Sequence, residues 1–427
     1  MTKTQLLSMT AGLAIVMGLA AAQSAGAQAT VDNNFGRDRS VAVNDRAKTD
    51  YQPLGIRLGA FMANPQIGVS LNSNDNVFYD DAKKKSDVVL EVTPSVEVAS
   101  DWSRNALAFG ISSAIDQYGS ATTENATSWN AHASGRYDIS SHVNVFGNLS
   151  HDDGVLSRSD PLASTNSAKP TKRQFDNITT GFTLVGNRLR LIAQTSQREE
   201  TYHDVLDNVG GTIPEHLRNL TTYTGSVRVD YALSPNVSVY VNGELNRRKY
   251  DDFNQARFNA KGSILSVGTS FDLDKLARGE IEVGSVNQTQ KYQPALGKQT
   301  STYVNGKVEW YPTEITTVTF NAGTNFTDAG LSGAPTALVT RAGVNVDHEL
   351  LRNLILSAGL NGEKYAFKGL DRTDTRQRLS FAANYFLSRR VVLNASFNHD
   401  QLKSRGAAAY NKPFTDNNIQ VGIVLKY

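Results

Sequence analysis

Histidines and carboxylates are the residues of this sequence whose types and spacing come nearest to catalytic chemistry. His151, Asp152 and Asp153 place an imidazole beside two carboxylates, the groups that general acid–base catalysis uses. Acidic and histidine residues are also ordinary at the exposed ends of β-strands. A catalytic site would need further partner residues on neighbouring strands. The seven histidines contain no HExxH pair, and no GxSxG motif occurs. We therefore predict that the protein is not an enzyme and has no catalytic residues.

Composition removes several other kinds of site. The 427 residues include no cysteine, which excludes thiol nucleophiles, disulfides and cysteine-bound metals. The acidic cluster at Asp80 and Asp81 lacks the ligand spacing of an EF-hand, so we expect no metal site and no cofactor. The 43 Lys and Arg nearly balance the 41 Asp and Glu, and no basic run suggests a nucleic-acid partner.

A second group of candidates consists of charged residues that alternate with apolar ones. If Leu189 and Leu191 face lipid, Arg188 and Arg190 face the opposite side. The same alternation turns further charges inward: basic Arg198, Arg228, Lys307, Arg376, Arg378 and Lys426, and acidic Asp230, Glu244, Glu280, Glu282 and Glu309. Two roles remain open. Cross-strand ion pairs could hold a wall together, or the charges could line a pore and filter solutes. The eight basic against five acidic positions predict a preference for anions.

The segments that carry these residues are predicted β-strands. Residues 226–231 and 237–242 alternate with period two on either side of a Pro235–Asn236 turn, the pattern of a hairpin. Eight such short turns recur between about residues 102 and 388, whereas the other connections, such as 152–173 and 199–219, are long and polar. A first strand at 66–78 and a last at 418–427 bring the count to about 18, with 16 as the alternative. This asymmetry predicts an all-β fold: a single closed antiparallel transmembrane β-barrel with short periplasmic turns and long extracellular loops.

Aromatic residues near the short turns fit this prediction. We expect a periplasmic girdle of rings at the membrane interface, formed by Tyr137, Tyr231, Trp310, Tyr311, Tyr385 and Phe386.

The N-terminal region divides into two parts before the barrel. Lys3, the apolar stretch 6–22 and the small residues 25–27 predict a signal peptide over residues 1–27, cleaved after Ala27. Residues 28–63 are predicted to be a periplasmic segment, and residues 64–427 to be the barrel. Together these features predict export to the bacterial outer membrane.

The chain ends on a predicted strand, IQVGIVLKY. Its alternation turns Ile419, Val421, Ile423, Leu425 and Tyr427 toward lipid, and Gln420 and Lys426 toward the lumen. A terminal aromatic residue resembles the signal by which the barrel-assembly machinery recognises its clients. We therefore assign the assembly signal to Tyr427, Leu425 and Ile423.

Three stretches resemble a known family: residues 51–61 (YQPLGIRLGAF), 74–78 (NDNVF) and 100–105 (SDWSRN). Together they resemble the putative β-barrel porin 2 family of proteobacterial outer-membrane proteins. Members often accompany exopolysaccharide synthesis and export, so the resemblance implies a role in polymer export and polysaccharide export proteins as partners. It implies no catalytic residues.

We therefore expect a porin-like channel for passive passage of solutes, which could include exported polysaccharide. Its pore-lining candidates are Arg188, Arg190, Arg228, Glu280, Glu282, Lys307, Glu309, Arg376 and Arg378. Its expected partners are outer-membrane lipid and the assembly machinery. A structural barrel that anchors a periplasmic export assembly through residues 28–63 is the alternative. A hydrolase acting through His151 and Asp152 is a third class.

Overall fold

The computed structural model describes residues 41–427 except 165, 292–296, 332–333 and 409–412. The signal peptide predicted over residues 1–27, and residues 28–40 of the N-terminal segment, lie outside the described residues. No helix in the described part of the chain is long and apolar enough to span a membrane.

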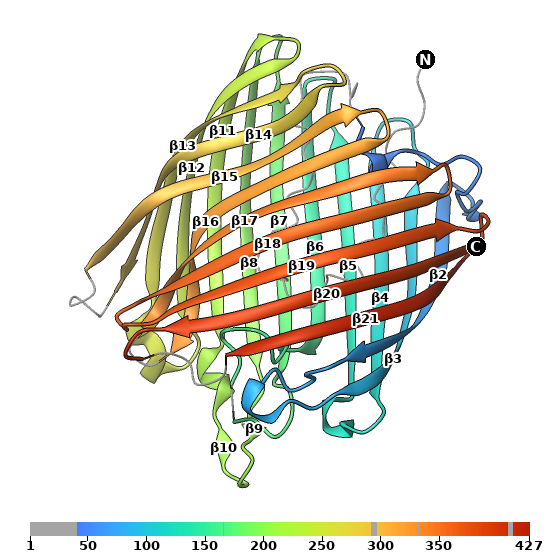
Figure 1. The fold of residues 1–427 in the computed structure, drawn as a ribbon. Helices are drawn as coiled ribbons and strands as arrows, with labels where there is room; N and C mark the ends of the chain where they lie inside the picture. Colours follow the sequence, from blue (N-terminus) through green and yellow to red (C-terminus); the bar gives the residue numbers. More distant parts are fainter. Residues whose placement is uncertain (1–40, 165, 292–296, 332–333, 409–412) are drawn as a thin grey trace.

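Eighteen antiparallel strands close into one barrel (Figure 1), because β21 pairs with β2 along Gln66–Asn74 while every other strand pairs with its neighbours in sequence. The barrel strands are β2 (Phe61–Asn74), β3 (Asp87–Ser100), β4 (Ala106–Tyr118), β5 (Ala126–Asp138), β6 (Val143–Val155), β7 (Lys172–Val185), β8 (Leu189–Tyr202), β11 (Leu220–Ser234), β12 (Val237–Tyr250), β13 (Ala260–Asp272), β14 (Ala277–Gln290), β15 (Lys298–Thr313), β16 (Thr316–Leu331), β17 (Ala334–Leu351), β18 (Leu354–Lys368), β19 (Thr373–Phe386), β20 (Val391–Arg405) and β21 (Phe414–Lys426). Closure pairs the edges that an open sheet would expose to lipid.

The remaining elements are short and lie outside the barrel wall. The short strand β1 (Ile56–Leu58) pairs with β2, and β9 (Val205–Leu206) with β10 (Thr212–Ile213). Short 3₁₀ helices are η1 (Val43–Asp45), η2 (Asp81–Lys83), η3 (Thr122–Glu124), η4 (Glu215–Arg218) and η5 (Phe253–Phe258).

Alternation along each strand separates an outer apolar face from a polar lumen. On β12, Val239, Val241 and Leu245 are exposed on the outside, whereas Ser238 and Tyr240 are buried on the inside. The period-two geometry of a strand makes this separation unavoidable.

The aromatic girdle is partly as predicted. Tyr137, Tyr231, Trp310 and Tyr385 are exposed on the outer face beside the short turns. Tyr311 and Phe386 are not girdle residues: each directly follows an outward-facing ring in the same strand and so points inward. The Tyr311 hydroxyl donates to Glu309 at 2.7 Å.

The first strand is shifted from its predicted position. The sequence predicts this strand at 66–78, whereas β2 spans Phe61–Asn74. The Asn74 side chain accepts a hydrogen bond from the Asn76 backbone N–H at 2.7 Å, which turns the chain out of the sheet four residues earlier than expected. At the loop end, one connection is shorter than expected: β16 ends at Leu331 and β17 begins at Ala334.

Residues 41–51 lie against the short-turn end of the barrel, where the C-terminus also lies. The fully buried Val43 donates its N–H to the Thr317 hydroxyl at 3.0 Å. Lys48 donates to the Arg352 carbonyl at 3.3 Å and lies 3.5 Å from Glu349. The described end of the N-terminal segment is therefore fixed to the periplasmic mouth of the barrel itself.

Candidate functional site

The lumen wall from β8 through β11, β12 and β13 to β14 carries a connected set of ion pairs. Arg190 and Asp230 are directly opposed across β8 and β11 and lie 3.1 Å apart. Arg228 lies 2.8 Å from Asp230 and reaches Glu280 on β14 at 2.7 Å. Two arginines and two carboxylates thus neutralise one another along the wall.

Tyr240 on β12 contacts two members of this set of ion pairs, Glu280 and Arg228. Its hydroxyl donates to Glu280 at 2.8 Å, and the Arg228 guanidinium lies 3.5 Å from its ring centroid. The phenol crosses Gly268 on the adjacent β13, where a Cβ atom would lie 2.2 Å from Cζ of Tyr240. The missing side chain at Gly268 is what allows Tyr240 to lie along the wall.

A second cluster lies on β14 and β15. Glu309 is almost fully buried and accepts from Arg278 at 3.0 Å, while Lys307 lies 2.7 Å away. The Lys307 side chain is 62% exposed, so its ammonium is open to the lumen. This cluster has two bases for one acid. Further into the wall, Glu282 is buried and accepts from Asn242 at 3.1 Å and from Ser266.

A third cluster lies on β19 and β20. Arg376 pairs with Asp400, and Arg378 lies 2.8 Å from the same carboxylate. Arg376 also donates to the Ser159 hydroxyl at 3.0 Å. Because Ser159 belongs to the loop between β6 and β7, this bond joins distant parts of the barrel.

The loop 156–171 therefore extends across the extracellular mouth. Arg158 pairs with Glu124 of the β4–β5 loop at 2.5 Å, and the Pro161 carbonyl accepts from Arg372 between β18 and β19 at 3.1 Å. Strands β6 and β7 are far from β19 in the strand order of the barrel. The loop consequently narrows the mouth.

The hairpin of β16 and β17 bends into the same mouth. Pairing between β15 and β16 ends at Asn305 and Gly323, yet β16 stays paired with β17 as far as Leu331 and Ala334, with one register shift after Asp328. Beyond Gly323 the outer face of β16 therefore no longer meets lipid. Phe326 has the same parity along β16 as the lipid-facing Phe320, but its ring packs against Ile264 and Val286 on the lumen side of β13 and β14.

Polar contacts attach this inward part of the hairpin to the wall. Arg248 donates to the Phe326 carbonyl at 2.6 Å. The Tyr250 hydroxyl donates to Asp328, and the Gln290 amide donates to the Thr336 hydroxyl. We call these three side chains, Arg248, Tyr250 and Gln290, the hairpin anchors.

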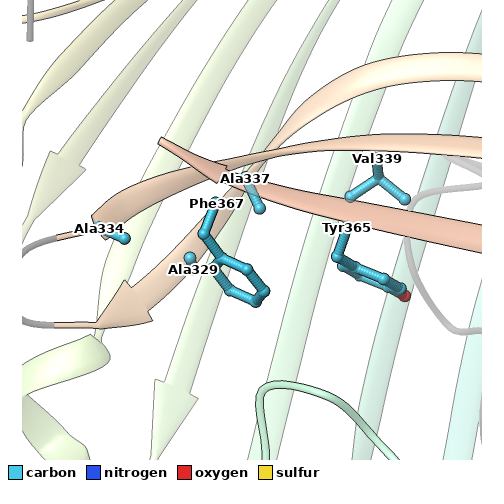
Figure 2. Packing of buried hydrophobic residues seen from close by; sticks show 6 residues of the cluster. All are labelled: Ala329, Ala334, Ala337, Val339, Tyr365 and Phe367. Atoms are coloured by element: carbon cyan, nitrogen blue, oxygen red, sulfur yellow. The ribbon is translucent and has the colours of Figure 1, made fainter. Parts of the chain in front are cut away.

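The other face of the hairpin forms a buried apolar cluster with β18 (Figure 2). The rings of Tyr365 and Phe367 lie alongside small hairpin side chains, and Leu162 and Leu370 pack against the cluster, whose hairpin members are Ala329, Ala334, Ala337 and Val339. Leu162 comes from the loop 156–171, so loop and hairpin meet. The two segments therefore contact each other at the extracellular mouth of the barrel.

The extracellular β8–β11 loop contains two local pairs, Arg218 with Glu215 at 2.8 Å and His216 with Asp204. The His216 backbone N–H donates to Asp204 at 3.0 Å, and the His216 ring nitrogen lies 2.6 Å from the same carboxylate. The backbone hydrogen bond and the adjacent imidazole hold the pKa of Asp204 below its ordinary value. Farther along, Arg218 lies against the hairpin, since a Cβ at Gly330 would be 2.8 Å from its Nε.

Of the nine predicted pore-lining residues, eight project into the lumen and one does not. Eight project into the lumen from the clusters above: Arg190, Arg228, Glu280, Glu282, Lys307, Glu309, Arg376 and Arg378. Arg188 does not line the pore. It lies exposed in the turn between β7 and β8, because β8 begins only at Leu189. Whether the eight filter solutes stays a prediction.

His151 and Asp152 do not form one site. His151 points outward, 4.6 Å from the Trp129 ring and 2.7 Å from Asp176. Asp152 is on the opposite face, where it accepts from Asn130 at 2.7 Å. Adjacent strand residues cannot share a face, so these two residues cannot act together. No group of three or more His, Asp or Glu in the described ranges is arranged to hold a metal ion.

The C-terminal strand exposes Ile423, Leu425 and Tyr427 on the outer face. The Tyr427 backbone N–H donates to the Pro65 carbonyl at 3.1 Å, which joins the chain end to the first barrel strand. On the inner face, Gln420 donates to Ser70 at 2.7 Å and to Glu91 at 2.8 Å. The role of these residues in assembly stays a prediction.

A closed barrel with an apolar exterior and a charged lumen defines the class of porin-like outer-membrane proteins. The chain belongs to the family described as Putative beta-barrel porin 2, whose sequence pattern matches residues 48–427. No protein of curated function matches the sequence.

Solved structures of similar architecture are outer-membrane barrels. OccK2 (OpdF) of Pseudomonas aeruginosa is 9% identical with a TM-score of 0.47, over 85% of this chain and 98% of that one. OccAB3 of Acinetobacter baumannii is 10% identical with a TM-score of 0.46, over 87% and 100%. The copper transporter OprC is 10% identical with a TM-score of 0.45, over 87% and 81%. TM-scores and sequence identities at this level support no inference about the solute that this protein transports.

Proposed function

We propose that the protein is a passive outer-membrane channel for small hydrophilic solutes, narrowed at its extracellular mouth. The observation that carries the proposal is the inward β16–β17 hairpin, which meets the loop 156–171 above a charged lumen. An eighteen-strand barrel is wide enough for an aqueous lumen. The constriction therefore sets the size limit for solutes.

The lumen charges supply a filter as well as a size limit. The two-base cluster around Lys307 lies on β14 and β15, whereas Glu91 and Asp116 lie on β3 and β4, on the other side of the barrel in strand order. When Glu91 and Asp116 are ionised, opposite charges on facing walls create a transverse field that orients and sorts charged solutes. The cross-strand pairs also hold the wall together, so in this proposal the same residues serve both roles considered from the sequence.

Passage of an exported polysaccharide would require the extracellular mouth to open. A polymer would have to pass the meeting point of loop and hairpin, and Arg372 and Arg376 both bond the loop there. A polymer route therefore requires the loop, the hairpin or both to move out of the mouth. The docking alternative receives no support from residues 43–48, because their contacts are with the barrel itself.

Planar-bilayer recordings test the proposal. We expect the purified protein to give discrete conductance steps, with a reversal potential in a salt gradient that indicates anion preference. Absence of conductance from folded protein would refute the channel. Cation preference would refute the charge argument and leave the channel standing.

A further inference from the structure

Four basic side chains gather on the outer face of the barrel at the loop end of β12, β13 and β15. They are Arg247, Lys249, Lys261 and Lys298, and all four are exposed. They share this face with the aliphatic Leu245 and Leu265, which are 70% and 66% exposed. The group, called the outer basic patch here, does not belong to the lumen.

The strand register brings these charges close together. Arg247 and Lys261 are direct partners across β12 and β13, so their strands place them about 5 Å apart. Lys261 is the partner of Thr289, and Thr289 is the partner of Lys298, so Lys298 follows two strands further on at roughly 10 Å. Lys249 lies two residues beyond Arg247 on the same face of β12.

Directly opposed like charges destabilise a sheet unless something neutralises them. In the lumen, Arg190 has Asp230 and Arg378 has Asp400. No ion pair joins any side chain of the outer basic patch to a carboxylate in the described part of the chain. Two exposed carboxylates lie near the patch: Glu199 is separated from Lys249 by Thr221, and Asp251 follows Lys249 by two residues just past the end of β12. Neither forms an ion pair with the patch, so its four cations are available to an anion from outside the protein.

The height of the patch identifies the kind of anion. On β12 the outward side chains run apolar from Val237 through Val239 and Val241 to Leu245, and Arg247 is the next outward residue. A strand crosses the hydrocarbon layer in about 9–11 residues, so Arg247 lies where the outer leaflet's headgroups begin. Headgroup phosphates are the anions found at that level.

We propose that the outer basic patch binds the phosphate groups of a phosphorylated lipid in the outer leaflet, while its acyl chains pack on Leu245 and Leu265. Arginine donates two parallel N–H hydrogen bonds to phosphate oxygens in a bidentate fork, and the lysines add point charges around it. This site lies on the lipid face of β12–β15, which are adjacent in Figure 1, and is independent of solute passage through the lumen.

Lipid binding by the full-length folded barrel tests the proposal. The probe is bisphosphorylated lipid A added to detergent-solubilised protein, with bound lipid counted by native mass spectrometry. We expect Arg247→Gln/Lys261→Gln/Lys298→Gln to weaken binding by about a hundredfold, since each cation near an anionic surface contributes roughly fivefold. Heat-dependent electrophoretic mobility shows that the variant is folded. If it fails to fold, Lys261→Gln/Lys298→Gln replaces it, with an expected loss of about thirtyfold.

The matched control removes three cations from the same face at other strands. Lys364, Lys403 and Arg405 are exposed and outward-facing, and Thr375 separates Lys364 from Lys403 as Thr289 separates Lys261 from Lys298. This group lacks only a directly opposed pair of bases such as Arg247 and Lys261, so the control tests whether that pair makes the site. We expect Lys364→Gln/Lys403→Gln/Arg405→Gln to retain most of the binding. Equal losses in the two triple variants would overturn the site. Equal binding of lipid A from which the phosphates have been removed would overturn the role of phosphate.

Discussion

Replacing Phe326 by alanine tests whether the inward β16–β17 hairpin narrows the channel. The Phe326 side chain is 2% exposed and packs on Ile264 and Val286 of the lumen wall. Removing a buried ring costs about 3–5 kcal/mol. Because this cost falls on the docked hairpin, a loss of about 3 kcal/mol would reduce the ratio of docked to undocked hairpin by roughly a hundredfold.

Single-channel recording of Phe326→Ala would show this change as longer and larger open events than in the wild-type protein. The matched control is Phe320→Ala, which removes the same ring from the same face of the same strand. Phe320 lies before the bend, where it is 43% exposed toward lipid, so its loss should leave the conductance unchanged. If folded Phe326→Ala and Phe320→Ala give the same records as wild type, the hairpin does not control the mouth.

Three further changes test other parts of the account. Gly268→Ala should lower the free energy of unfolding, measured by urea titration, by about 1–3 kcal/mol, since the new Cβ meets the Tyr240 ring. The loss should be smaller in a Tyr240→Ala background, and equal losses in the two backgrounds would contradict the packing argument. Deleting Tyr427 should slow insertion into the outer membrane far more than it alters the conductance of inserted protein, as measured by heat-modifiable mobility over time; normal insertion would remove it as the assembly signal. Thr317→Val should leave the buried Val43 N–H without its acceptor, at a cost of about 1–3 kcal/mol, and so expose residues 41–51 to limited proteolysis, whereas an unchanged cleavage pattern would show that this bond does not hold the segment.

Strand alternation alone predicted most of the barrel wall. The period of two is fixed by backbone geometry, so the inward placement of Arg190, Arg228 and Glu309 follows once one lipid-facing neighbour is known. The errors arose at strand ends. Arg188 has the right parity but lies beyond the first residue of β8, and Tyr311 and Phe386 were assigned to the girdle against their own parity.

The constriction could not be predicted in the same way. Alternation predicts that Phe320 and Phe326 lie on the same face of β16. It does not predict that this face contacts lipid at Phe320 and the lumen wall at Phe326. One signal was present in the sequence: from Ala334 to Val339 apolar residues occupy both parities, which is typical of a strand buried on both faces. The contacts of the loop 156–171 with Arg372 and Arg376 join residues more than two hundred positions apart, and no local pattern encodes them.

Uptake of neutral sugars of graded size into liposomes tests the central claim most directly. We predict that wild-type protein admits monosaccharides and excludes tetrasaccharides, and that Arg248→Gln/Tyr250→Phe/Gln290→Ala, which removes the hairpin anchors, admits both. A control variant of the same wall, Ser238→Ala/Ser270→Ala, should keep the wild-type limit. Identical size limits in the anchor variant and the wild type, or no uptake by either, would contradict a channel narrowed by its own hairpin.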